Sequence, residues 1–372
     1  MRISIDSSLL LYANWSGVQI YTYRILEAMT RLADSEDRFT LRCDRAVRNE
    51  GLDLLESRAN VTRCNRLGHL RFHGLLPIDI LTRRHQIYYS FSGRIKTPLS
   101  CPVVLTIYDN GKYVIPDYFG SAHNSGARQH EGKLLRAQAG LITISETVKE
   151  EIVNLFEVSP EKVTVIPPAA ERDDPTLPDQ CPPNLRWPHY ILMVNPGRAY
   201  KNWSDALSGF AEYTFLNPSD TETCLVLAGD LRGETELIER GRAEKGDGIA
   251  RRILLLGHVS DQELRYLYRH ARVVVLPSLY EGFGIPALEA MSYDVPLIVS
   301  DIPVLREVAG NAALRFTTGH TEELAQMFLH CIEDEALRTD LVARGQTRLA
   351  DFSWERSGQG TLDTLKTIVA AG

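Results

Sequence analysis

The sequence predicts an α/β protein with two doubly wound parallel sheets, one in each half of the chain. Three observations lead to this prediction. The 372 residues exceed the length that one hydrophobic core usually serves. Short β-branched runs alternate with helical patterns in both halves, which is typical of right-handed βαβ units. Residues 167–188 contain seven prolines, and such a composition continues neither a helix nor a central strand.

The elements follow from the hydrophobic pattern. The first half is expected to contain strands at 2–6, 102–107, 140–144 and 162–166, and helices at about 17–33 and 146–156. The second half is expected to contain strands at 190–194, 224–228, 253–256, 273–276 and 297–300, separated by helices, and a helical stretch at about 321–370. We therefore expect one domain at 1–170, a linker at 171–188, a second domain at 189–352, and a helix at 353–372 that crosses back to the first domain.

Composition excludes several classes of protein. Apolar content of 44% and charged content of 24% are ordinary for a globular protein, and a net charge of −7 argues against a nucleic-acid partner. No apolar run approaches the roughly 20 residues that span a bilayer, and the chain begins in a strand-like alternation without a charged leader. A cytoplasmic location is expected.

Metal and disulfide chemistry are not indicated. The six cysteines and ten histidines are scattered, without Cys-x-x-Cys or His-Glu-x-x-His. There is also no Asp-x-Asp pair to hold a metal against a diphosphate. We expect metal-independent chemistry without a cofactor.

The charge is nevertheless uneven, because residues 58–112 are strongly basic. This segment carries Arg58, Arg63, Arg66, Arg71, Arg83, Arg84, Arg94, Lys96 and Lys112 against only Asp79 and Asp109. Apolar residues are interleaved, so the segment fits a peripheral contact with an anionic membrane or with a lipid-diphosphate acceptor. A plain solvated face is the alternative.

The most informative stretch is Glu281-Gly-Phe-Gly-Ile-Pro-Ala-Leu-Glu289. It follows a buried β-run, so Glu281 is expected at the carboxyl end of a strand, where ligands bind in open α/β sheets. Two glycines allow close approach of a ligand, and Pro286 suits the first position of a helix whose free amides attract a diphosphate. Glu289 then lies about one turn into the helix, where two ribose hydroxyls would satisfy its oxygens. A glycine turn without a ligand is the plainer interpretation.

Four segments together resemble the retaining GT-B glycosyltransferases of family four, and the resemblance covers nearly the whole chain. These are Gly140 to Val148 with Pro160 to Pro167, Val194 to Asn202, Ile253 to Leu264, and Glu281 to Glu289. The last fits the family's Glu-x7-Glu motif residue for residue. The resemblance implies a GT-B fold, in which two Rossmann-like doubly wound domains face each other across a cleft.

The resemblance also implies roles for residues of the second half. Lys201 and Arg198 would neutralise the leaving diphosphate, and Glu281 would contact the hydroxyls of the donor sugar. These three are the predicted catalytic residues. Glu289 would bind the ribose. The remaining predicted donor-binding residues are Gly197, Asn202, Gly257, His258, Val259, Leu264, Gly282, Phe283, Gly284 and Ile285.

In the first half the predicted acceptor-side and sugar-side residues are Gly17, Tyr108 and Asp109. Many relatives carry histidine in a Thr-x-His-Asp turn, whereas this chain has Thr106-Ile107-Tyr108-Asp109. A phenol still donates to a sugar hydroxyl but does not titrate near neutral pH. Gly17 is a single glycine before a helix, and a plain loop is its alternative interpretation.

The resemblance implies transfer of a hexose from a nucleotide diphosphate sugar to a glycan or lipid-linked acceptor. The setting it implies is cell-surface polysaccharide assembly, that is, O-antigen, capsule or exopolysaccharide. GDP-mannose is the first expectation for the donor, with UDP-glucose and UDP-N-acetylglucosamine open. A non-catalytic nucleotide-sugar-binding protein and a GT-B sugar-nucleotide epimerase are the alternatives.

Overall fold

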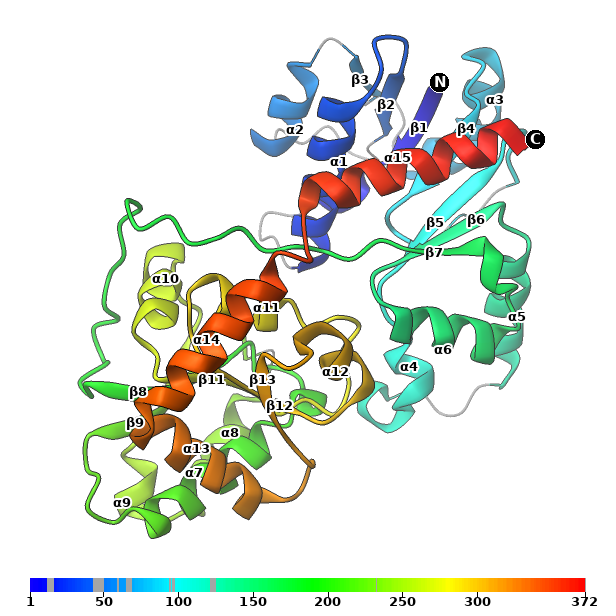
Figure 1. Ribbon diagram of the computed structural model, residues 1–372. Coiled ribbons are helices and arrows are strands. Elements are labelled where there is room, and N and C mark those ends of the chain that lie inside the picture. Colours follow the sequence, from blue (N-terminus) through cyan, green and yellow to red (C-terminus); the bar gives the residue numbers. More distant parts are fainter. Residues whose placement is uncertain are drawn as a thin grey trace. The chain divides into compact units, whose positions relative to one another are not determined.

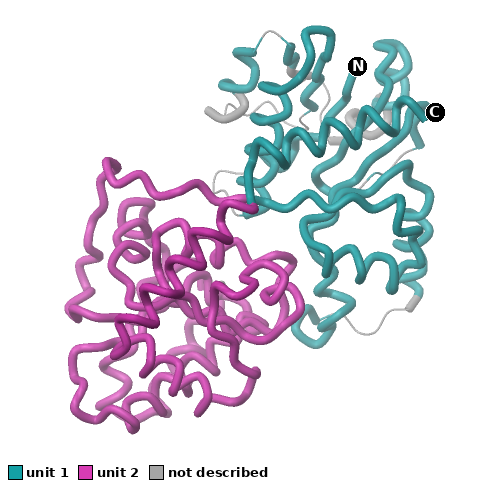
Figure 2. The backbone as a smooth tube through the Cα atoms, in the orientation of Figure 1, with its two compact units in different colours: residues 1–168, 352–372 teal, residues 169–351 magenta. Residues whose placement is uncertain are grey.

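The computed structural model describes residues 1–11, 17–42, 50–58, 60–64, 69–93, 95, 98–120, 125–231 and 233–371. At 11, 50–52, 63–64, 69–75 and 125 only the backbone is described. The chain forms two compact units, shown in different colours in Figure 2. Unit 1 comprises residues 1–168 and 352–372, and unit 2 comprises residues 169–351.

Unit 1 is built on a parallel sheet with the strand order β3-β2-β1-β4-β5-β6-β7 in its described part (Figure 1). The order reverses between β1 and β4, which is the arrangement of a doubly wound fold. The strands are β1 (Arg2–Asp6), β2 (Arg38–Arg42), β3 (Val61–Cys64), β4 (Ile87–Ser90), β5 (Val103–Ile107), β6 (Gly140–Thr143) and β7 (Val163–Val165). The helices are α1 (Gly17–Leu32), α2 (Glu50–Glu56), α3 (His69–Thr82), α4 (Gly111–Val114), α5 (Ser125–Arg136), α6 (Glu146–Phe156) and α15 (Trp354–Ala371), with short 3-10 turns at Ser8–Leu11, Pro116–Phe119 and Pro160–Lys162.

The last helix of the chain, α15, belongs to unit 1 and packs on α1. The two helices approach closely where Gly358 of α15 lies on Ala28 of α1, since a Cβ added at Gly358 would be 2.4 Å from the Cβ of Ala28. Ser357 Oγ donates to the carbonyl of Pro167 at 2.6 Å, which ties the start of α15 to the end of the preceding part of unit 1.

Unit 2 has a parallel sheet with the strand order β10-β9-β8-β11-β12-β13. Its order reverses between β8 and β11, which lie side by side with Val273 in register with Ile191. The strands are β8 (His189–Val194), β9 (Thr223–Ala228), β10 (Ile253–Gly257), β11 (Val273–Leu276), β12 (Leu297–Ser300) and β13 (Ala313–Phe316). The helices are α7 (Trp203–Leu216), α8 (Thr235–Ala243), α9 (Asp247–Ala250), α10 (Asp261–His270), α11 (Ile285–Ser292), α12 (Pro303–Ala309), α13 (Thr321–Glu333) and α14 (Glu335–Leu349), with a 3-10 turn at Ala199–Lys201.

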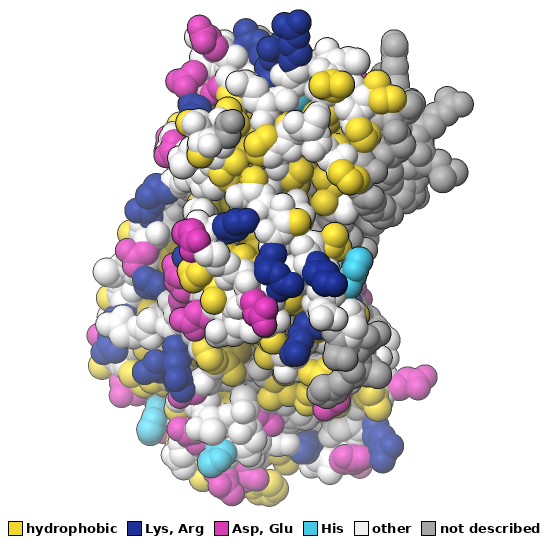
Figure 3. All heavy atoms as spheres, turned by 90° about the vertical axis from the view of Figure 1, so that its right-hand side faces the viewer, with side chains coloured by type: hydrophobic (Ala, Val, Ile, Leu, Met, Phe, Trp, Pro, Cys, Tyr) yellow, Lys and Arg dark blue, Asp and Glu magenta, His cyan; other side chains and the backbone are white. Residues whose placement is uncertain are grey.

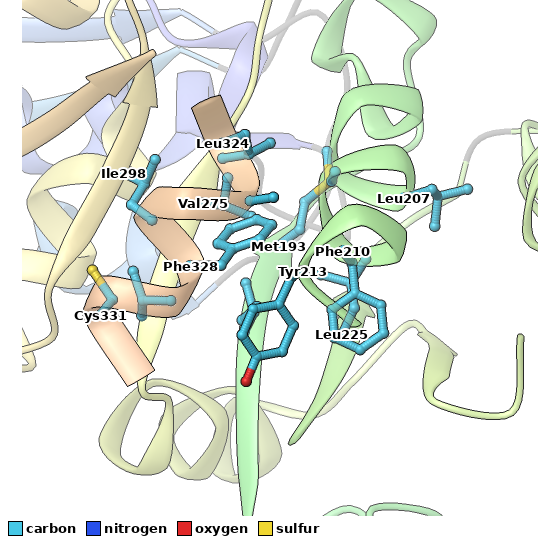
Figure 4. Packing of buried hydrophobic residues seen from close by; sticks show 14 of the residues in the cluster. Met193, Leu207, Phe210, Tyr213, Leu225, Val275, Ile298, Leu324, Phe328 and Cys331 are labelled. Atoms are coloured by element: carbon cyan, nitrogen blue, oxygen red, sulfur yellow. The ribbon is translucent and has the colours of Figure 1, made fainter. Parts of the chain in front are cut away.

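The core of unit 2 lies between its sheet and the helices α7 and α13 (Figure 4). Met193 and Val275 come from the two central strands, while Phe210 of α7 and Phe328 of α13 pack against them. All four side chains are at most 1% exposed. Because these strands are buried on both faces, their sequences are continuous apolar runs, which is why the pattern predicts them well.

The prediction of two parallel-sheet α/β domains is confirmed. The predicted strands and helices agree with the structure to within one or two residues, and the stretch 321–370 is helical apart from short breaks before Glu335 and Trp354. The pattern predicts no element at β2, β3, β4 or β13. Arginines interrupt β2, β3 and β13, and β4 contains two tyrosines and a serine, so no continuous aliphatic run marks them.

The proline-rich segment 171–188, predicted as a linker, is counted with unit 2. Arg269 of α10 holds it through ion pairs to Asp173 at 2.7 Å and Asp179 at 3.0 Å. The backbone amide of Gln180 also donates to the carbonyl of Gln262 at 3.1 Å. The segment therefore runs along α10 in this structure.

Candidate functional site

The residues predicted in the second half of the chain gather at the carboxyl edge of the unit 2 sheet. The loop after β8 carries Lys201, and the loop after β11 carries Glu281. These two strands are neighbours at the point where the strand order reverses. In open α/β sheets this is the position where the two loops diverge and leave room for a ligand.

Lys201 and Glu281 form an ion pair at this point. The Nζ atom of Lys201 lies 2.7 Å from Oε1 and 2.8 Å from Oε2 of Glu281. Ser278 Oγ donates to Oε1 at 2.8 Å, so the carboxylate accepts from a cation and a hydroxyl. Glu281 is 8% exposed, and a carboxylate that far from water needs such partners. The sequence predicted both charged residues but assigned them separate roles and did not predict Ser278.

The loop after β8 is held in place by its neighbours. The buried Asn202, at φ +57°, donates from Nδ2 to the carbonyl of Pro277 at 3.0 Å and to Asp205 at 2.6 Å. The backbone amide of Leu279 donates to the carbonyl of Tyr200 at 2.8 Å. Asn202 was predicted to bind the donor, whereas in this structure its side-chain amide joins the loop of Lys201 to that of Glu281.

Gly197 fits a close approach of two loops. A Cβ at this position would lie 2.1 Å from the carbonyl oxygen of Asp230, which belongs to the loop after β9. Only a residue without a side chain fits there. Arg198, the next residue, is exposed and has no ion pair among the described residues. The structure thus brings Lys201, but not Arg198, to Glu281.

The glycine turn leads directly into α11. Gly284 has φ +91° and lies at the amino-terminal end of the helix, and Pro286 occupies the second helical position rather than the predicted first. Gly282 and Ile285 are half-buried, while Phe283 is only 3% exposed, so its side chain belongs to the interior. Pro286 has no amide hydrogen and the amide of Ala287 donates to the carbonyl of Gly284 at 2.9 Å, so the amide of Ile285 is the one left at this end for an anion in the described hydrogen bonds.

Glu289 lies one turn further along α11 and is half-buried. Its Oε2 accepts a hydrogen bond of 2.6 Å from the hydroxyl of Tyr268, and Oε1 has no partner among the described residues. Burial raises the pKa of Glu289, and the Tyr268 hydrogen bond opposes that rise. Tyr268, on α10, is 1% exposed and stacks on Tyr293 with ring centroids 5.0 Å apart. The sequence did not predict Tyr268, although it lies one helical turn after the predicted Leu264.

The loop after β10 completes this edge. Gly257 has φ +64° with open space around its Cα, His258 is exposed, and Val259 and Leu264 are half-buried. Ser260 and Glu263 then cap α10, each side chain bonding the backbone amide of the other. The carbonyl of Gly257 accepts from the amide of Gly229 at 2.7 Å, so the predicted backbone contact to a base falls on the exposed His258 and the half-buried Val259.

The three residues predicted in the first half lie in unit 1. Gly17 begins α1, and Tyr108 and Asp109 follow β5. The hydroxyl of Tyr108 lies 3.3 Å from Oγ1 of Thr22, and its ring meets that of Tyr21 edge-on. Burial raises the pKa of Tyr108 well above its ordinary value. Asp109 is exposed and accepts from the amide of Gly111 at 3.1 Å.

The predicted absence of a metal or cofactor stays a prediction. Among the described residues, no three histidine, cysteine, aspartate or glutamate side chains gather as a candidate metal site. In the same part of the chain, no helix is long and apolar enough to cross a membrane.

Comparison with known proteins gives concordant family matches for both parts of the chain. The family model described as "Glycosyl transferases group 1" matches residues 186–348, and that described as "Glycosyltransferase Family 4" matches residues 15–174. The O-antigen chain mannosyltransferase B of Escherichia coli is 30% identical over 277 residues, which cover 71% of this chain and 70% of that protein. The O-antigen chain mannosyltransferase RfbU of Salmonella typhimurium is 31% identical over 223 residues, or 59% of this chain and 57% of that protein.

Solved structures agree in fold. The Anabaena protein HepE in complex with UDP-glucose superposes with a TM-score of 0.74, covering 99% of this chain and all of that one, at 15% sequence identity. The lipopolysaccharide outer core galactosyltransferase WaaB superposes with a TM-score of 0.66 over 99% of each chain, at 14% identity.

Proposed function

This chain belongs to the GT-B glycosyltransferases of group 1, and from that membership we propose that it is a retaining, metal-independent hexosyltransferase with GDP-mannose as its donor. The acceptor in this proposal is a glycan or a lipid-linked oligosaccharide of a cell-surface polysaccharide. Two relatives at 30% and 31% identity that are named as O-antigen chain mannosyltransferases support both the sugar and the pathway.

One observation carries the assignment of the site: the ion pair of Lys201 and Glu281 where β8 and β11 meet. Glu281 fixes the ammonium group from both carboxylate oxygens. A diphosphate bound at the amino-terminal end of α11 would therefore find a preoriented cation and the positive end of the helix dipole together. Charge that develops on a leaving diphosphate is stabilised most by groups already in place.

In the proposed reaction, the protein contributes mainly by binding the diphosphate and stabilising its charge. The bond between the anomeric carbon and the diphosphate oxygen breaks, and the same carbon forms a bond to the acceptor hydroxyl oxygen. The hydroxyl proton passes to the departing diphosphate. Glu281 is not a hydrolase-type acid or base here, because its oxygens already accept from Lys201 and Ser278. Its proposed part is to orient Lys201 and a sugar hydroxyl.

We place the nucleoside across the neighbouring loops. Glu289 has one oxygen without a described partner and one held by Tyr268, so a ribose diol would complete its hydrogen bonds. The backbone at His258 and Val259 would take the base. Guanine is the proposed base because the named relatives are mannosyltransferases, and uridine sugars are the competing outcome of the test below.

The acceptor side is proposed for unit 1, with Gly17, Tyr108 and Asp109 near it. A peripheral contact with the inner face of the cytoplasmic membrane through residues 58–112 is part of the proposal. Of the basic side chains in that segment, only Arg58, Arg83, Arg84 and Lys112 belong to the described part of the structure. The remainder lie outside it.

The donor is tested by thermal unfolding with GDP-, UDP-, ADP- and dTDP-sugars, without added metal. A ligand at about 100 times its dissociation constant stabilises the native state by ~2.7 kcal/mol. A selective shift with GDP-mannose supports the proposal. A selective shift with a uridine sugar replaces the donor, and the absence of any shift in a folded sample contradicts the site.

Turnover is tested by Glu281→Ala, with Glu236→Ala as the matched control on the exposed face of α8. Losing the carboxylate frees Lys201, so we expect transfer to fall by about 100-fold or more, while donor binding is partly retained. The control should transfer at the normal rate. Product formed without any acceptor would instead indicate an epimerase, and no transfer by the natural chain across a broad acceptor panel would indicate a binding protein.

A further inference from the structure

An arginine-lined hollow lies at the amino-terminal ends of β1 and β2 in unit 1, and it takes no part in the proposed transfer. Its volume is about 440 Å³. Its lining holds four guanidinium groups, an imidazole and two hydroxyls, and no acidic side chain. The lining residues are Arg2, Arg38, Thr40, Thr82, Arg83, Arg84 and His85.

The fold forces these cations together. Arg2 and Arg38 are register partners on adjacent parallel strands, which run about 4.8 Å apart, so their side chains leave the same face of the sheet. Thr40 lies two residues after Arg38 and shares that face. Arg83 and Arg84 reach the same hollow from the end of α3. Like charges placed directly opposite each other destabilise a sheet.

The neighbouring acidic groups do not balance this charge. Asp79 accepts from Arg83 Nε at 2.8 Å and also from the buried Arg42, so it is shared between two guanidinium groups. In the described hydrogen bonds, the guanidinium group of Arg38 donates to the backbone carbonyls of residues 35 and 37 and to no carboxylate. The side chains of Arg2 and Arg84 have no partner in the described part of the chain. At least two cations of the hollow are therefore uncompensated.

The buried Arg42 contacts the lining residue His85 from the interior. His85 is 9% exposed and its Nδ1 has no partner, while its Nε2 lies 3.1 Å from Nη2 of Arg42. Arg42 is 1% exposed and retains an unpartnered Nη1. Burial and the Arg42 charge lower the pKa of His85 to about 4, so its ring is neutral at neutral pH and adds no negative charge to the hollow.

We propose that this hollow binds a phosphate group, either free or carried by a lipid headgroup. Guanidinium forks match phosphate oxygens in pairs, and Thr40 adds a hydroxyl donor, whereas the hydroxyl of Thr82 donates to the carbonyl of Asp79. The site lies at the amino-terminal edge of the unit 1 sheet, whereas Tyr108 and Asp109 follow the carboxyl end of β5. It is therefore separate from the proposed acceptor side.

A lipid headgroup as the source of the phosphate rests on the membrane contact proposed above for residues 58–112, because Arg83 and Arg84 belong to that segment. Ile78 and Leu81 of α3 are 59% and 66% exposed, and they lie three residues apart on one helix face. In Figure 3, basic side chains gather at the top edge of the molecule beside a run of hydrophobic ones. Two exposed aliphatic side chains next to a phosphate site suit a membrane surface.

The test compares the intact chain with Arg2→Gln/Arg84→Gly. Glycine is chosen at 84 because Arg84 has φ +53°, a conformation that glycine adopts freely, so the variant is expected to fold. Arg128→Gln/Arg251→Gln removes the same charge from exposed positions elsewhere. Lys201→Ala alters the other proposed anion site, at the end of α11, so it shows which of the two sites a phosphate compound occupies. Inorganic phosphate and diphosphate are titrated by calorimetry at low salt. Vesicles of phosphatidylcholine, with and without phosphatidylglycerol, are tested by co-sedimentation.

The proposal is supported if inorganic phosphate or diphosphate binds to the intact chain, to the charge control and to Lys201→Ala, and binds to Arg2→Gln/Arg84→Gly about tenfold more weakly or worse. The same loss seen only with phosphatidylglycerol vesicles also supports it and identifies a lipid headgroup as the source. Equal binding by the double variant, or no binding of either probe to the intact chain, overturns it. Binding that Arg2→Gln/Arg84→Gly loses and Lys201→Ala keeps belongs to the hollow, whereas binding that only Lys201→Ala loses belongs to the transferase site, so failure of this proposal is distinguishable from failure of that site.

Discussion

Tyr268 controls the state of Glu289, the carboxylate proposed to hold the ribose. Burial raises the pKa of Glu289, and the hydrogen bond from Tyr268 opposes that effect. Tyr268→Phe removes the hydroxyl and keeps the ring that stacks on Tyr293. We expect the KM for the donor to rise roughly fivefold, equivalent to ~1 kcal/mol, with a smaller change in kcat.

We also expect Tyr268→Phe to shift the pH dependence of kcat/KM. Without the Tyr268 hydrogen bond the pKa of Glu289 rises further, so the acidic limb of kcat/KM should move to higher pH. Tyr293→Phe is the matched control, because the hydroxyl of Tyr293 does not contact Glu289 in the described hydrogen bonds. An unchanged KM and an unchanged acidic limb in Tyr268→Phe would show that Glu289 does not hold the donor.

His85 makes unit 1 sensitive to acid. Its pKa is lowered to about 4 in the folded state, first by burial and then by Arg42, against about 6.5 in the unfolded chain. The unfolded chain therefore binds the proton first, and stability falls as the pH drops from about 6.5 to 4. The loss from this one residue reaches up to about 2 kcal/mol at pH 5.

Urea unfolding of unit 1 at pH 7.5 and pH 5.0 measures this loss. The natural chain should lose more stability between the two pH values than His85→Gln, which has no titrating ring. Other groups titrate alike in both proteins, so the difference isolates His85. Equal losses in the two proteins would contradict the prediction.

At the scale of elements, the contact between α1 and α15 depends on one glycine. An added Cβ at Gly358 would lie 2.4 Å from the Cβ of Ala28 and 3.1 Å from backbone atoms of residues 28 and 29. Backbone cannot move aside cheaply, so Gly358→Ala should lower the free energy of unfolding of unit 1 by about 1–3 kcal/mol.

Gly360→Ala on the same helix is the control for this variant. Its added Cβ would meet only the Cδ1 of Ile166, at 2.9 Å, and the far end of a side chain can rotate away. Alanine also favours a helix over glycine by ~1 kcal/mol. We expect little or no loss of stability for Gly360→Ala, measured by urea unfolding. A loss for Gly358→Ala that is no larger than the loss for Gly360→Ala would contradict the prediction.

For the whole molecule, the sequence predicts the fold class and most central strands because they are apolar runs buried on both faces. Val273 to Leu276 is such a run. Strands β2, β3 and β13 are not predicted because arginines interrupt their apolar residues, and β4 is not predicted because it contains two tyrosines and a serine. Burial of a short strand depends on its neighbours in the sheet, and a local sequence pattern does not predict the order of the strands.

The candidate site was predictable in its residues but not in its contacts. Lys201 and Glu281 are 80 positions apart, and their pairing depends on β8 and β11 being adjacent in the sheet. Ser278 precedes the predicted motif by three residues, and Tyr268 comes from a different helix, so neither carries a local signal. The joining role of Asn202 likewise requires the loop after β11 to lie beside it.

The division of the chain into units predicts how a truncation acts. Unit 2 is one continuous segment, whereas unit 1 needs residues 352–372 from the far end of the chain. Leu362 and Leu365 of α15 are fully buried, and each contributes about 1.5–3 kcal/mol by burial. Ending the chain after residue 351 removes both and uncovers the face of α1 that carries Ala28 and Met29.

Calorimetry should therefore show an altered unfolding of unit 1 in the truncated chain, with a lower midpoint or a lost transition. Unit 2 keeps all of Lys201, Glu281 and Glu289 on an intact sheet. Unit 2 should retain its own unfolding transition. The nucleotide sugar that stabilises the full chain should still raise the midpoint of that transition. Sugar transfer requires the acceptor side proposed for unit 1, so the transfer rate should fall when unit 1 is destabilised. An unaltered unit 1 transition, or loss of donor stabilisation in a folded unit 2, would show that the two units do not fold and bind as the chain division predicts.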